Sequence, residues 1–561
     1  MKNIIFKSVI TLAASAFVLT GCIKETFPEG STVTVSQLSE SSDAIKGLLN
    51  SIPAAMVTTG TAGYLSNYEH HGDFGIGEIH MITENMLEDF VTLGANPFYN
   101  RNYSWGMNKN QGEDYWPCAY FWDCYYPWIK ICNDVISSLT AVGEPAVGSE
   151  QAGLLAQAYA YRAYFYLDLA RLYEYKNTKY EKYNKPELVG LTVPIVTDKT
   201  TEQEAGNNPR AKSDVMYNFI LADLENAAKF FVGTSVNVYE PNKNLVNGLF
   251  ARAYLEMGAN GINREGEDSY ALAAEYADLV INAGYSPLTQ DQWEDPTNGF
   301  NNATANSSWI WGLGITAENY NNICTYAAFI CSEGQWGYAP LVQLGISNKL
   351  YNLIPDADFR KHSWLDPNID YYDYKFSGTE KNATDFVGGS EEQQIPAAAP
   401  YESIKFRPAA GNCTDNTVGN AVDQCMMRVE EMYFIKAEAL AASSVDAGAS
   451  VLTDFMQTYR YGSYSCSASS KEDFLEELLL QKRIEFWGEG ILMFDYKRLD
   501  HGIERGYEGT LWPSDWCFNS EGRSPQWNIV ITRSETQTNK GVPAALNNPD
   551  PTDFTTLWTA K

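Results

Sequence analysis

Histidine and carboxylate side chains gather between residues 70 and 80, and they are the groups in this sequence best suited to holding a metal ion. His70, His71, Asp73, Glu78 and His80 supply imidazole nitrogens and carboxylate oxygens, which are common ligands of metals in proteins. The stretch has the composition of a loop, and its ligands follow no repeating spacing. A chance cluster is therefore the favoured interpretation, and we expect no bound metal.

Motifs that perform known reactions are missing from the sequence. It contains no phosphate-binding GxxxxGK[ST] loop, no HExxH zinc motif and no GxSxG nucleophile turn, so no cofactor is expected. Its 70 acidic residues leave open a pair of catalytic carboxylates of the kind that glycoside hydrolases use. No two of them stand out by position.

Aromatic side chains are abundant, and several lie in two segments rich in glycine and asparagine. The chain has 14 Trp, 36 Tyr and 25 Phe. A sugar ring has a partly apolar face that suits an aromatic ring, and its hydroxyl groups need polar partners. The candidate ligand-binding residues are Arg101, Tyr103, Trp105 and Asn108 in residues 101–112, and Tyr320, Tyr326, Trp336 and Tyr338 in residues 319–340.

Tryptophans in loops and in helices have different expected roles. Each candidate aromatic ring in the two loops either contacts a ligand or, as the alternative, packs beneath its own loop. Trp122 and Trp128 belong to a stretch with helical periodicity, and we expect both to lie in the core.

Charged residues near the C-terminal end indicate structural ion pairs rather than catalysis. Glu485 and Glu489 are four residues apart, and like charges at this spacing on one helix repel each other. They need cations, and Arg483 and Arg498 are the nearest candidates. Arg428 and Glu431 are three residues apart and can pair along one helix face. We expect such pairs to fix helix register.

The first 21 residues resemble an export signal. Lys2 and Lys7 form a basic start, and residues 9–19 form an apolar run that is too short to span a membrane. Leu19-Thr20-Gly21-Cys22 resembles the bacterial lipobox, in which the cysteine receives a diacylglyceryl group and becomes the first residue after cleavage. A plain signal peptide is the alternative. The polar residues 23–40 then form a tether between the lipidated Cys22 and the fold.

Composition restricts the class of partner. The net charge is −30, which makes phosphate backbones poor partners, so no nucleic acid is expected. Removing residues 1–21 removes Lys2 and Lys7 and takes the charge from −30 to −32. Nine cysteines remain besides Cys22, and none forms a CxxC pair. An odd number leaves at least one unpaired, and we expect most to be small buried apolar groups.

Apolar periodicity predicts a mainly α protein with one domain over residues 41–561. Helices are expected in about 41–284 and again in 426–500, with Ser213 as one N-cap and Gly258 and Gly284 as helix ends. Small residues at the crossings resemble tetratricopeptide helical pairs, without the strict repeat. A generic helical bundle is the alternative. Residues 285–425 form a loop-rich insert in which residues 307–315 alternate like a strand, and residues 501–561 form a loop-rich tail.

Four segments together resemble the SusD/RagB family of outer-membrane lipoproteins of the Bacteroidota. Residues 428–440 (RVEEMYFIKAEAL) and 481–499 (QKRIEFWGEGILMFDYKRL) are similar to the two specific C-terminal helix signatures of that family. Residues 122–136 and 347–361 resemble two further family segments. Leu492 replaces the arginine expected after the EG pair, and NIVITRSETQTN replaces the usual Pro-Ile-Pro, which puts details of helix packing and tail docking in question.

The resemblance implies a non-catalytic protein on the cell surface. Members of the family bind oligosaccharides, or oligopeptides in RagB-like members, above a SusC-type TonB-dependent transporter. The sequence therefore predicts a lipid-anchored glycan-binding protein with such a transporter as its partner. An oligopeptide-binding member, a surface glycoside hydrolase and a purely structural lid are the alternatives.

Overall fold

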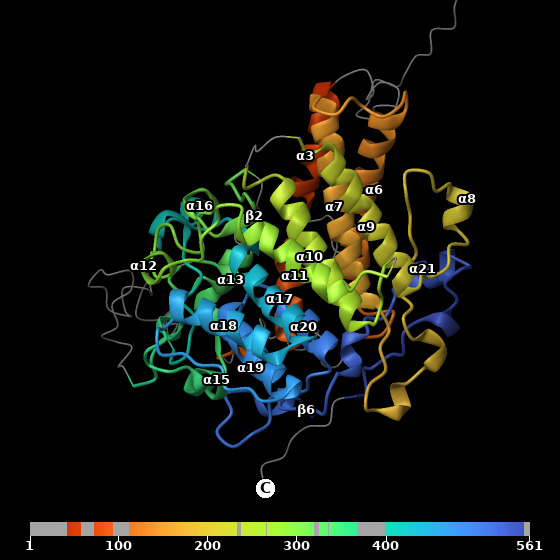
Figure 1. Cartoon of the computed structure of the whole chain (residues 1–561). Helices are drawn as coiled ribbons and strands as arrows, with labels where there is room; N and C mark the ends of the chain where they lie inside the picture. Colours follow the sequence, from red (N-terminus) through yellow and green to blue (C-terminus); the bar gives the residue numbers. More distant parts are fainter. Residues whose placement is uncertain are drawn as a thin grey trace, which may run out of the picture.

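The computed structural model describes residues 42–57, 72–93, 111–232, 237–264, 266–318, 325–334, 336–368 and 399–554. Helices form a scaffold that runs through most of this range (Figure 1). The expected mainly α fold is confirmed. The scaffold helices are α3 (Ser42–Val57), α4 (Ile76–Asn85), α6 (Trp116–Thr140), α7 (Glu150–Tyr173), α9 (Ser213–Phe230), α10 (Lys243–Ala259), α11 (Ser269–Ile281), α17 (Val429–Ala441), α18 (Val445–Tyr459), α19 (Lys471–Glu485) and α20 (Leu492–Leu499).

From α6 onward, each scaffold helix packs on the next one along the chain. Helix α6 packs on α7, α7 on α9, α9 on α10 and α10 on α11. Helix α11 then packs on α17, which follows only after the whole insert. The scaffold is therefore continuous in space although it is interrupted in sequence.

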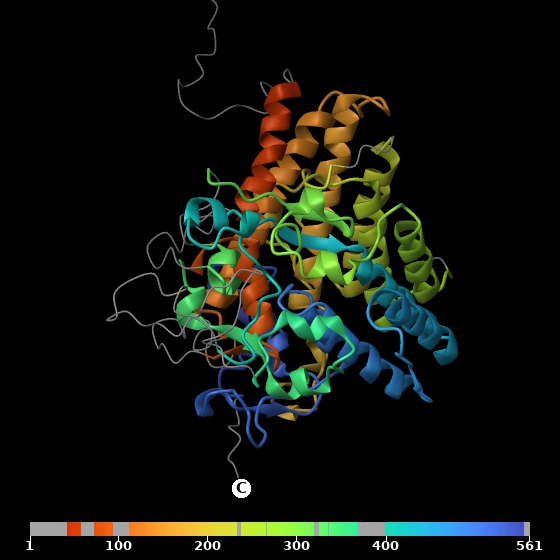
Figure 2. The same ribbon diagram turned by 90° about the vertical axis from the view of Figure 1, so that its left-hand side faces the viewer.

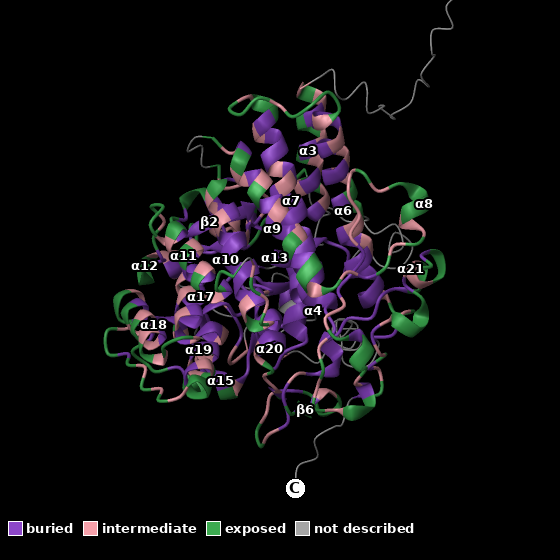
Figure 3. Ribbon diagram, turned by 45° about the vertical axis from the view of Figure 1, so that its right-hand side comes forward, coloured by how far each residue is buried: buried purple, intermediate pink, exposed green. Residues whose placement is uncertain are grey.

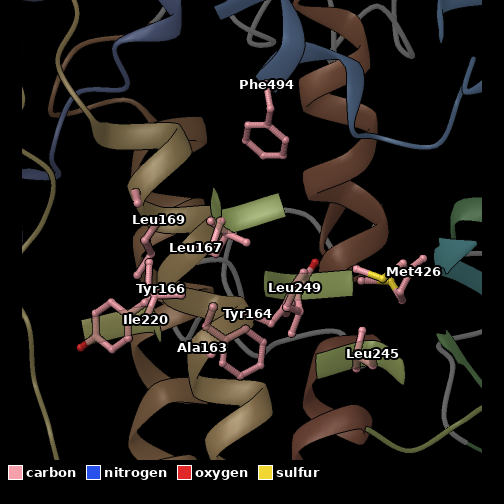
Figure 4. Close-up of a cluster of buried hydrophobic side chains, with 14 of the residues drawn as sticks. Ala163, Tyr164, Tyr166, Leu167, Leu169, Ile220, Leu245, Leu249, Met426 and Phe494 are labelled. Atoms are coloured by element: carbon pink, nitrogen blue, oxygen red, sulfur yellow. The ribbon is translucent and has the colours of Figure 1, made fainter. Parts of the chain in front are cut away.

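Large apolar side chains fill the space between these helices. Figure 4 shows Tyr164 and Leu167 of α7, Ile220 of α9 and Leu249 of α10 in one buried cluster. In Figure 3 the buried residues follow the facing sides of the scaffold helices, while the short helices α8 (Glu202–Ala205) and α21 (Arg533–Thr538) are exposed. Trp122 is 6% exposed and Trp128 is 0% exposed, which confirms that both are core residues.

Two predicted helix boundaries are wrong. Helix α9 has Lys212 at its N-cap with no side-chain hydrogen bond, and Ser213 is its first residue. The backbone N–H of Ser213 donates to the Gly190 carbonyl at 2.7 Å, so a tertiary contact fixes the start. Gly258 lies inside α10, where a Cβ would fall 2.9 Å from the Tyr270 ring. Close packing rather than helix termination requires that glycine.

The described strands form three antiparallel pairs. Strand β1 (Phe90–Thr92) pairs with β3 (Leu344–Ile346), β2 (Trp309–Leu313) with β4 (Gln424–Arg428), and β5 (Ile503–Glu504) with β6 (Asn519–Ser520). The strand expected around residue 309 is therefore confirmed. Figure 2 shows β2 in green beside β4 in teal. Because β4 leads directly into α17, this pair joins the insert to the scaffold.

The insert has its own apolar core, and the α-helices in its described residues are short. These are α12 (Gln290–Trp293), α13 (Tyr326–Ile330), α14 (Ala339–Val342), α15 (Asn348–Leu353) and α16 (Asn416–Gly419). Trp309, Phe329 and Trp487 belong to its core cluster. Six of the eight described cysteines outside the N-terminal segment are buried, in line with their expected role as small apolar groups.

Helix α20, through Lys497, and the tail, through Asn548, make polar contacts with the C-terminal end of α7. Lys497 Nζ donates to the carbonyls of Arg171 and Leu172, each at 2.9 Å, and Asn548 Nδ2 donates to the Tyr173 carbonyl at 3.0 Å. The last carbonyls of a helix lack intrahelical partners and attract cations. A segment with little regular structure therefore gains a fixed position.

Gly448 tests the close packing of the scaffold. A Cβ at this residue of α18 would lie 2.5 Å from the Ala437 carbonyl oxygen and 2.6 Å from the Ala441 Cβ. We expect Gly448→Ala to lower the free energy of unfolding by about 1–3 kcal/mol, because backbone atoms must move. Urea denaturation measures the change.

Gly153 in α7 is the matched control, since nothing lies within 4 Å of its Cβ position. Gly153→Ala is expected to be neutral or to stabilise by up to about 1 kcal/mol through helix propensity. Equal effects of the two substitutions would contradict the packing described for α17 and α18.

Candidate functional site

A buried carboxylate, Glu485, joins the insert to the scaffold. Arg360 of the insert donates to Glu485 at 2.9 Å, Arg428 at the end of β4 donates at 2.8 Å, and Arg460 at the end of α18 donates at 2.8 and 2.6 Å. The side chains of Glu485, Arg360 and Arg460 are fully buried, and that of Arg428 is 1% exposed. Four separate segments thus meet at one carboxylate.

Glu489 extends this cluster but does not share a helix with Glu485. Helix α19 ends at Glu485, and Gly488 and Gly490 have φ of +75° and +76°. These left-handed residues turn the chain sharply, so the expected repulsion along one helix face does not occur. Glu489 instead accepts from Arg428 Nε at 2.8 Å and from Lys405 Nζ at 2.6 Å.

The predicted partners of the charged residues are wrong, although all six residues take part in ion pairs. Arg483 binds Asp89 at 2.6 Å, and Arg498 binds Glu438 and Asp495. Glu431 pairs with Arg252 of α10 at 2.6 Å rather than with Arg428. Sequence proximity suggested pairs within one segment, whereas tertiary packing supplies partners from distant segments.

Electrostatics and aromatic rings both stabilise the charged cluster. Burial acts to raise the pKa of Glu485, but the guanidinium groups of Arg460 and Arg428 outweigh it and hold that pKa well below its usual range. The Arg428 guanidinium lies 4.4 Å from the Phe486 ring centroid, and Lys405 Nζ lies 4.9 Å from that of Phe300. Cations over ring faces gain further attraction in a desolvated site.

Of the candidate ligand-binding residues that the structure describes, Trp336 is the one whose side chain is partly exposed. It lies between α13 and α14, and its ring packs on two glycines. A Cβ at Gly419 of α16 would fall 2.2 Å from the ring atom Cη2, and one at Gly334 would fall 3.2 Å from Cζ2. The ring is therefore held in place by backbone atoms, with a part of its surface left open to solvent.

Tyr326 and Tyr338 pack inside the insert. They are 7% and 2% exposed. The Tyr326 hydroxyl donates to the Gly488 carbonyl, and the Tyr338 ring stacks on Phe329 with centroids 4.5 Å apart. In this structure both rings belong to the apolar core of the insert. The other five candidates lie outside the described residues, namely Arg101, Tyr103, Trp105, Asn108 and Tyr320.

A small cavity of about 20 Å³ lies beneath this part of the insert. His80, Tyr326, Gln424 and Glu489 are among its lining residues. Burial lowers the pKa of His80 to about 4, so its ring is neutral and its Nδ1 accepts from Gln424 Nε2 at 2.9 Å. The volume suits a single water molecule and is far too small for a sugar or a peptide.

Glu84 is a second unusual carboxyl group near the turn at Gly490. It is 2% exposed, and its Oε1 accepts from the Gly490 N–H at 2.8 Å. Burial raises the pKa of Glu84 to about 8, against the opposing effect of the backbone N–H groups of Gly490 and Gly488. The group therefore holds a proton in the folded protein at neutral pH.

Metal binding has no support among the described residues. No group of three or more His, Cys, Asp or Glu side chains in the described ranges is arranged to hold an ion. His70 and His71 lie outside those ranges. Asp73 and His80 are buried, and the Asp73 carboxylate accepts from the Tyr120 hydroxyl at 3.2 Å.

Two larger grooves are polar and lie on other parts of the surface. One of about 1000 Å³ lies between residues 195–208 and the tail, with Thr197, Asn207 and Lys540 among its lining residues. The other, of about 760 Å³, has Glu476 and Glu504 in its lining. Neither includes a tryptophan, so neither offers the broad apolar ring face that suits a sugar.

Sequence reasoning missed the insert's contribution to the charged cluster. Asp358 and Arg360 stand in the segment 347–361 that resembles the family, and Asp358 binds Arg360 at 2.6 Å. That motif was a usable signal for a buried arginine. Lys405 and Arg460 carried no comparable signal, because nothing in their local sequence indicates a partner far along the chain.

Comparison with known proteins supports the resemblance found in the sequence. Residues 73–255 match a SusD-like family model described as "starch-binding associating with outer membrane". A SusD-like carbohydrate binding protein from Bacteroides vulgatus superposes with a TM-score of 0.65 at 22% identity, over 89% of this chain and 96% of the other. The chain has the SusD-like fold. The resemblance to the SusD/RagB family is thereby confirmed.

Other solved structures superpose over a similar range. A SusD superfamily protein from Bacteroides thetaiotaomicron has a TM-score of 0.60 at 18% identity, covering 92% of this chain and all of the other. Surface glycan-binding protein A from the same species, in complex with laminarihexaose, has a TM-score of 0.61 at 14% identity, covering 90% and 99%. Among curated proteins, none matches this sequence.

The charged cluster makes a direct stability prediction. Glu485→Ala leaves Arg360, Arg428 and Arg460 short of a buried partner, and we expect it to lower the free energy of unfolding by about 3–5 kcal/mol. Glu476→Ala is the control on the same helix, since the Glu476 side chain is 69% exposed. Urea denaturation compares the two, and a loss below about 1 kcal/mol for Glu485→Ala would refute the role given to this carboxylate.

Glu84 makes a prediction about pH. Its folded pKa of about 8 exceeds the reference value of 4.5, so the folded state keeps a proton that the unfolded state releases between these values. The contribution of protonated Glu84 to the free energy of unfolding is complete below the reference pKa of 4.5. It is lost as the pH rises through the folded pKa of about 8.

Glu84→Gln retains the acceptor for Gly490 and cannot ionise. We expect the melting temperature of this variant, relative to the parent, to increase from about pH 5 to about pH 8. Glu202→Gln in the exposed helix α8 is the control. A difference between Glu84→Gln and the parent that does not change with pH would argue against a protonated Glu84.

Proposed function

We propose that this protein is a cell-surface glycan-binding lipoprotein that captures oligosaccharides or polysaccharides and delivers them to a SusC-type TonB-dependent transporter. The observation that carries this proposal is Trp336, a partly exposed ring fixed by backbone contacts within a SusD-like fold. A ring held in place binds a sugar face with little further loss of conformational entropy. The laminarihexaose complex of a structural relative supports a glycan as ligand.

Lipid attachment at Cys22 is the proposed means of membrane association. The lipobox-like residues 19–22 support it, as does the family description that refers to the outer membrane. In the described part of the chain, no helix is long and apolar enough to cross a bilayer. Labelling with radioactive palmitate, with Cys22→Ala as the control, tests the attachment.

The binding site is proposed to combine the two aromatic loops. Trp105, outside the described residues, and Trp336 are its candidate stacking rings, and the side chains of the same loops supply polar groups for hydroxyls. Nothing in the site requires a reaction step, and the protein is proposed to bind without catalysis. New reducing ends after incubation of polysaccharides with purified protein would instead indicate a glycoside hydrolase.

Replacing both tryptophans tests the site. We expect Trp105→Ala together with Trp336→Ala to abolish retention of the protein in affinity gels that contain the bound polysaccharide, since each stacking ring contributes about 1 kcal/mol or more. Trp516→Ala is the control, because Trp516 is a partly exposed ring in the tail.

Calorimetry with glycan and peptide panels then separates the two ligand classes. Binding of glycans by the parent and by Trp516→Ala, but not by the double variant, is the expected result. Unchanged retention of the double variant would eliminate these two rings, and binding of peptides alone would show an oligopeptide-binding protein.

A further inference from the structure

Four helix termini lie together at one end of the scaffold. They are the starts of α3 and α7 and the ends of α6 and α9. Residues 141–149 connect α6 to α7 there, and the end of α9 joins them through Lys229, whose Nζ binds Glu144 at 2.6 Å. Gln151 near the start of α7 donates to the Ser42 hydroxyl, at the first residue of α3, at 3.4 Å. Figure 1 shows the ends of α3, α6 and α7 together at the top of the molecule.

Three exposed valines mark this end, and we name Val142, Val147 and Val232 the valine end. Their exposed fractions are 95%, 55% and 65%. They are three of the ten large apolar side chains that are exposed among the described residues. A single exposed valine is ordinary, but three at one end, beside the exposed Ala141 and Ala146, form a surface that gains by leaving water.

The connection at residues 141–149 carries almost no net charge in a strongly acidic protein, although Asp43 and Glu150 are exposed carboxylates at the same end. The whole chain has a net charge of −30, so most of its surface is repelled by an anionic membrane. Residues 141–149 include a single charged side chain, Glu144, and Lys229 neutralises it. This connection therefore approaches an anionic lipid surface at lower electrostatic cost than an average part of the protein.

The chain also enters the fold at this end. Cys22 precedes Ser42, the first described residue, by 20 positions (42 − 22). An anchor at Cys22, which belongs to the proposed function, therefore attaches to the molecule on the side where the exposed valines lie.

We infer that the valine end is a lipid-contacting surface that rests in the interfacial layer of the membrane to which Cys22 is anchored. The occupant is a lipid surface, because the exposed groups are small and apolar and the one charge among residues 141–149 is paired. The contact is weak by itself and acts only once the anchor has raised the local concentration of lipid. It orients the scaffold with its α3 end toward the membrane, so that the insert does not face the lipid.

Crosslinking to lipid tests this orientation. The full-length lipidated protein is reconstituted in vesicles that contain a phospholipid with a photoactivatable diazirine in its acyl chain, and crosslinked peptides are identified by mass spectrometry. We expect crosslinks in residues 141–149 and at Val232, with few at the exposed Val189, Val215 and Leu546.

Matched variants sharpen the test. Val142→Asp with Val147→Asp is expected to reduce crosslinking at the valine end about tenfold, because carboxylates are unfavourable in contact with lipid. Val189→Asp with Val215→Asp, two valines with exposed fractions of 49% and 53%, should change nothing. Melting temperatures of both variants confirm that they fold.

Two outcomes would overturn the inference, and they are distinguishable. Crosslinks distributed evenly over the exposed apolar residues, or concentrated away from the valine end, would show that a lipidated protein does not rest on this surface. An intact mass without a diacylglyceryl group on Cys22 would remove the anchor and with it the proposed function on which the inference rests.

Discussion

The pairing of Glu485 with three buried arginines is the interaction on which the arrangement of the insert depends. Arg360 comes from the insert, Arg428 from the strand that returns from it, and Arg460 from the end of α18. Removing ionised groups from water is costly, so an arrangement that left any of them unpaired would be strongly disfavoured. The cluster therefore selects one position of the insert relative to the scaffold, even where apolar packing alone would tolerate several.

This division of roles explains how a large loop-rich segment can present a fixed surface. The helical scaffold supplies most of the apolar core. The insert adds a second core whose aromatic rings lie next to the charged groups. The Trp293 ring centroid, for example, lies 5.2 Å from the Arg460 guanidinium carbon. Trp336 then takes its position from neighbouring glycine backbones. In the proposed function, loops recognise the ligand, and the described loop around Trp336 has buried charges and rings beneath it.

Periodic features were predictable from the sequence, and long-range partners were not. Apolar spacing predicted helices within about residues 41–284 and 426–500 and the core positions of Trp122 and Trp128, because one buried face repeats along each helix. The partners of Glu485 and Glu489 depend on contacts between residues up to 125 positions apart, which local spacing does not encode. The same limit applies to the loops: composition identified Trp336, Tyr326 and Tyr338 together, but only the fold separates the partly exposed ring from the two buried ones.

Hydrogen–deuterium exchange in an Arg360→Met variant tests the central claim most directly. If buried charge pairs hold the insert in place, amide protection should fall in residues 325–342 and 399–425 and remain unchanged in α6, α7 and α9. The Lys361→Met variant is the control, since Lys361 pairs with the exposed carboxylate of Asp356. Unchanged protection of the insert in Arg360→Met, or an equal loss throughout the scaffold, would contradict the account.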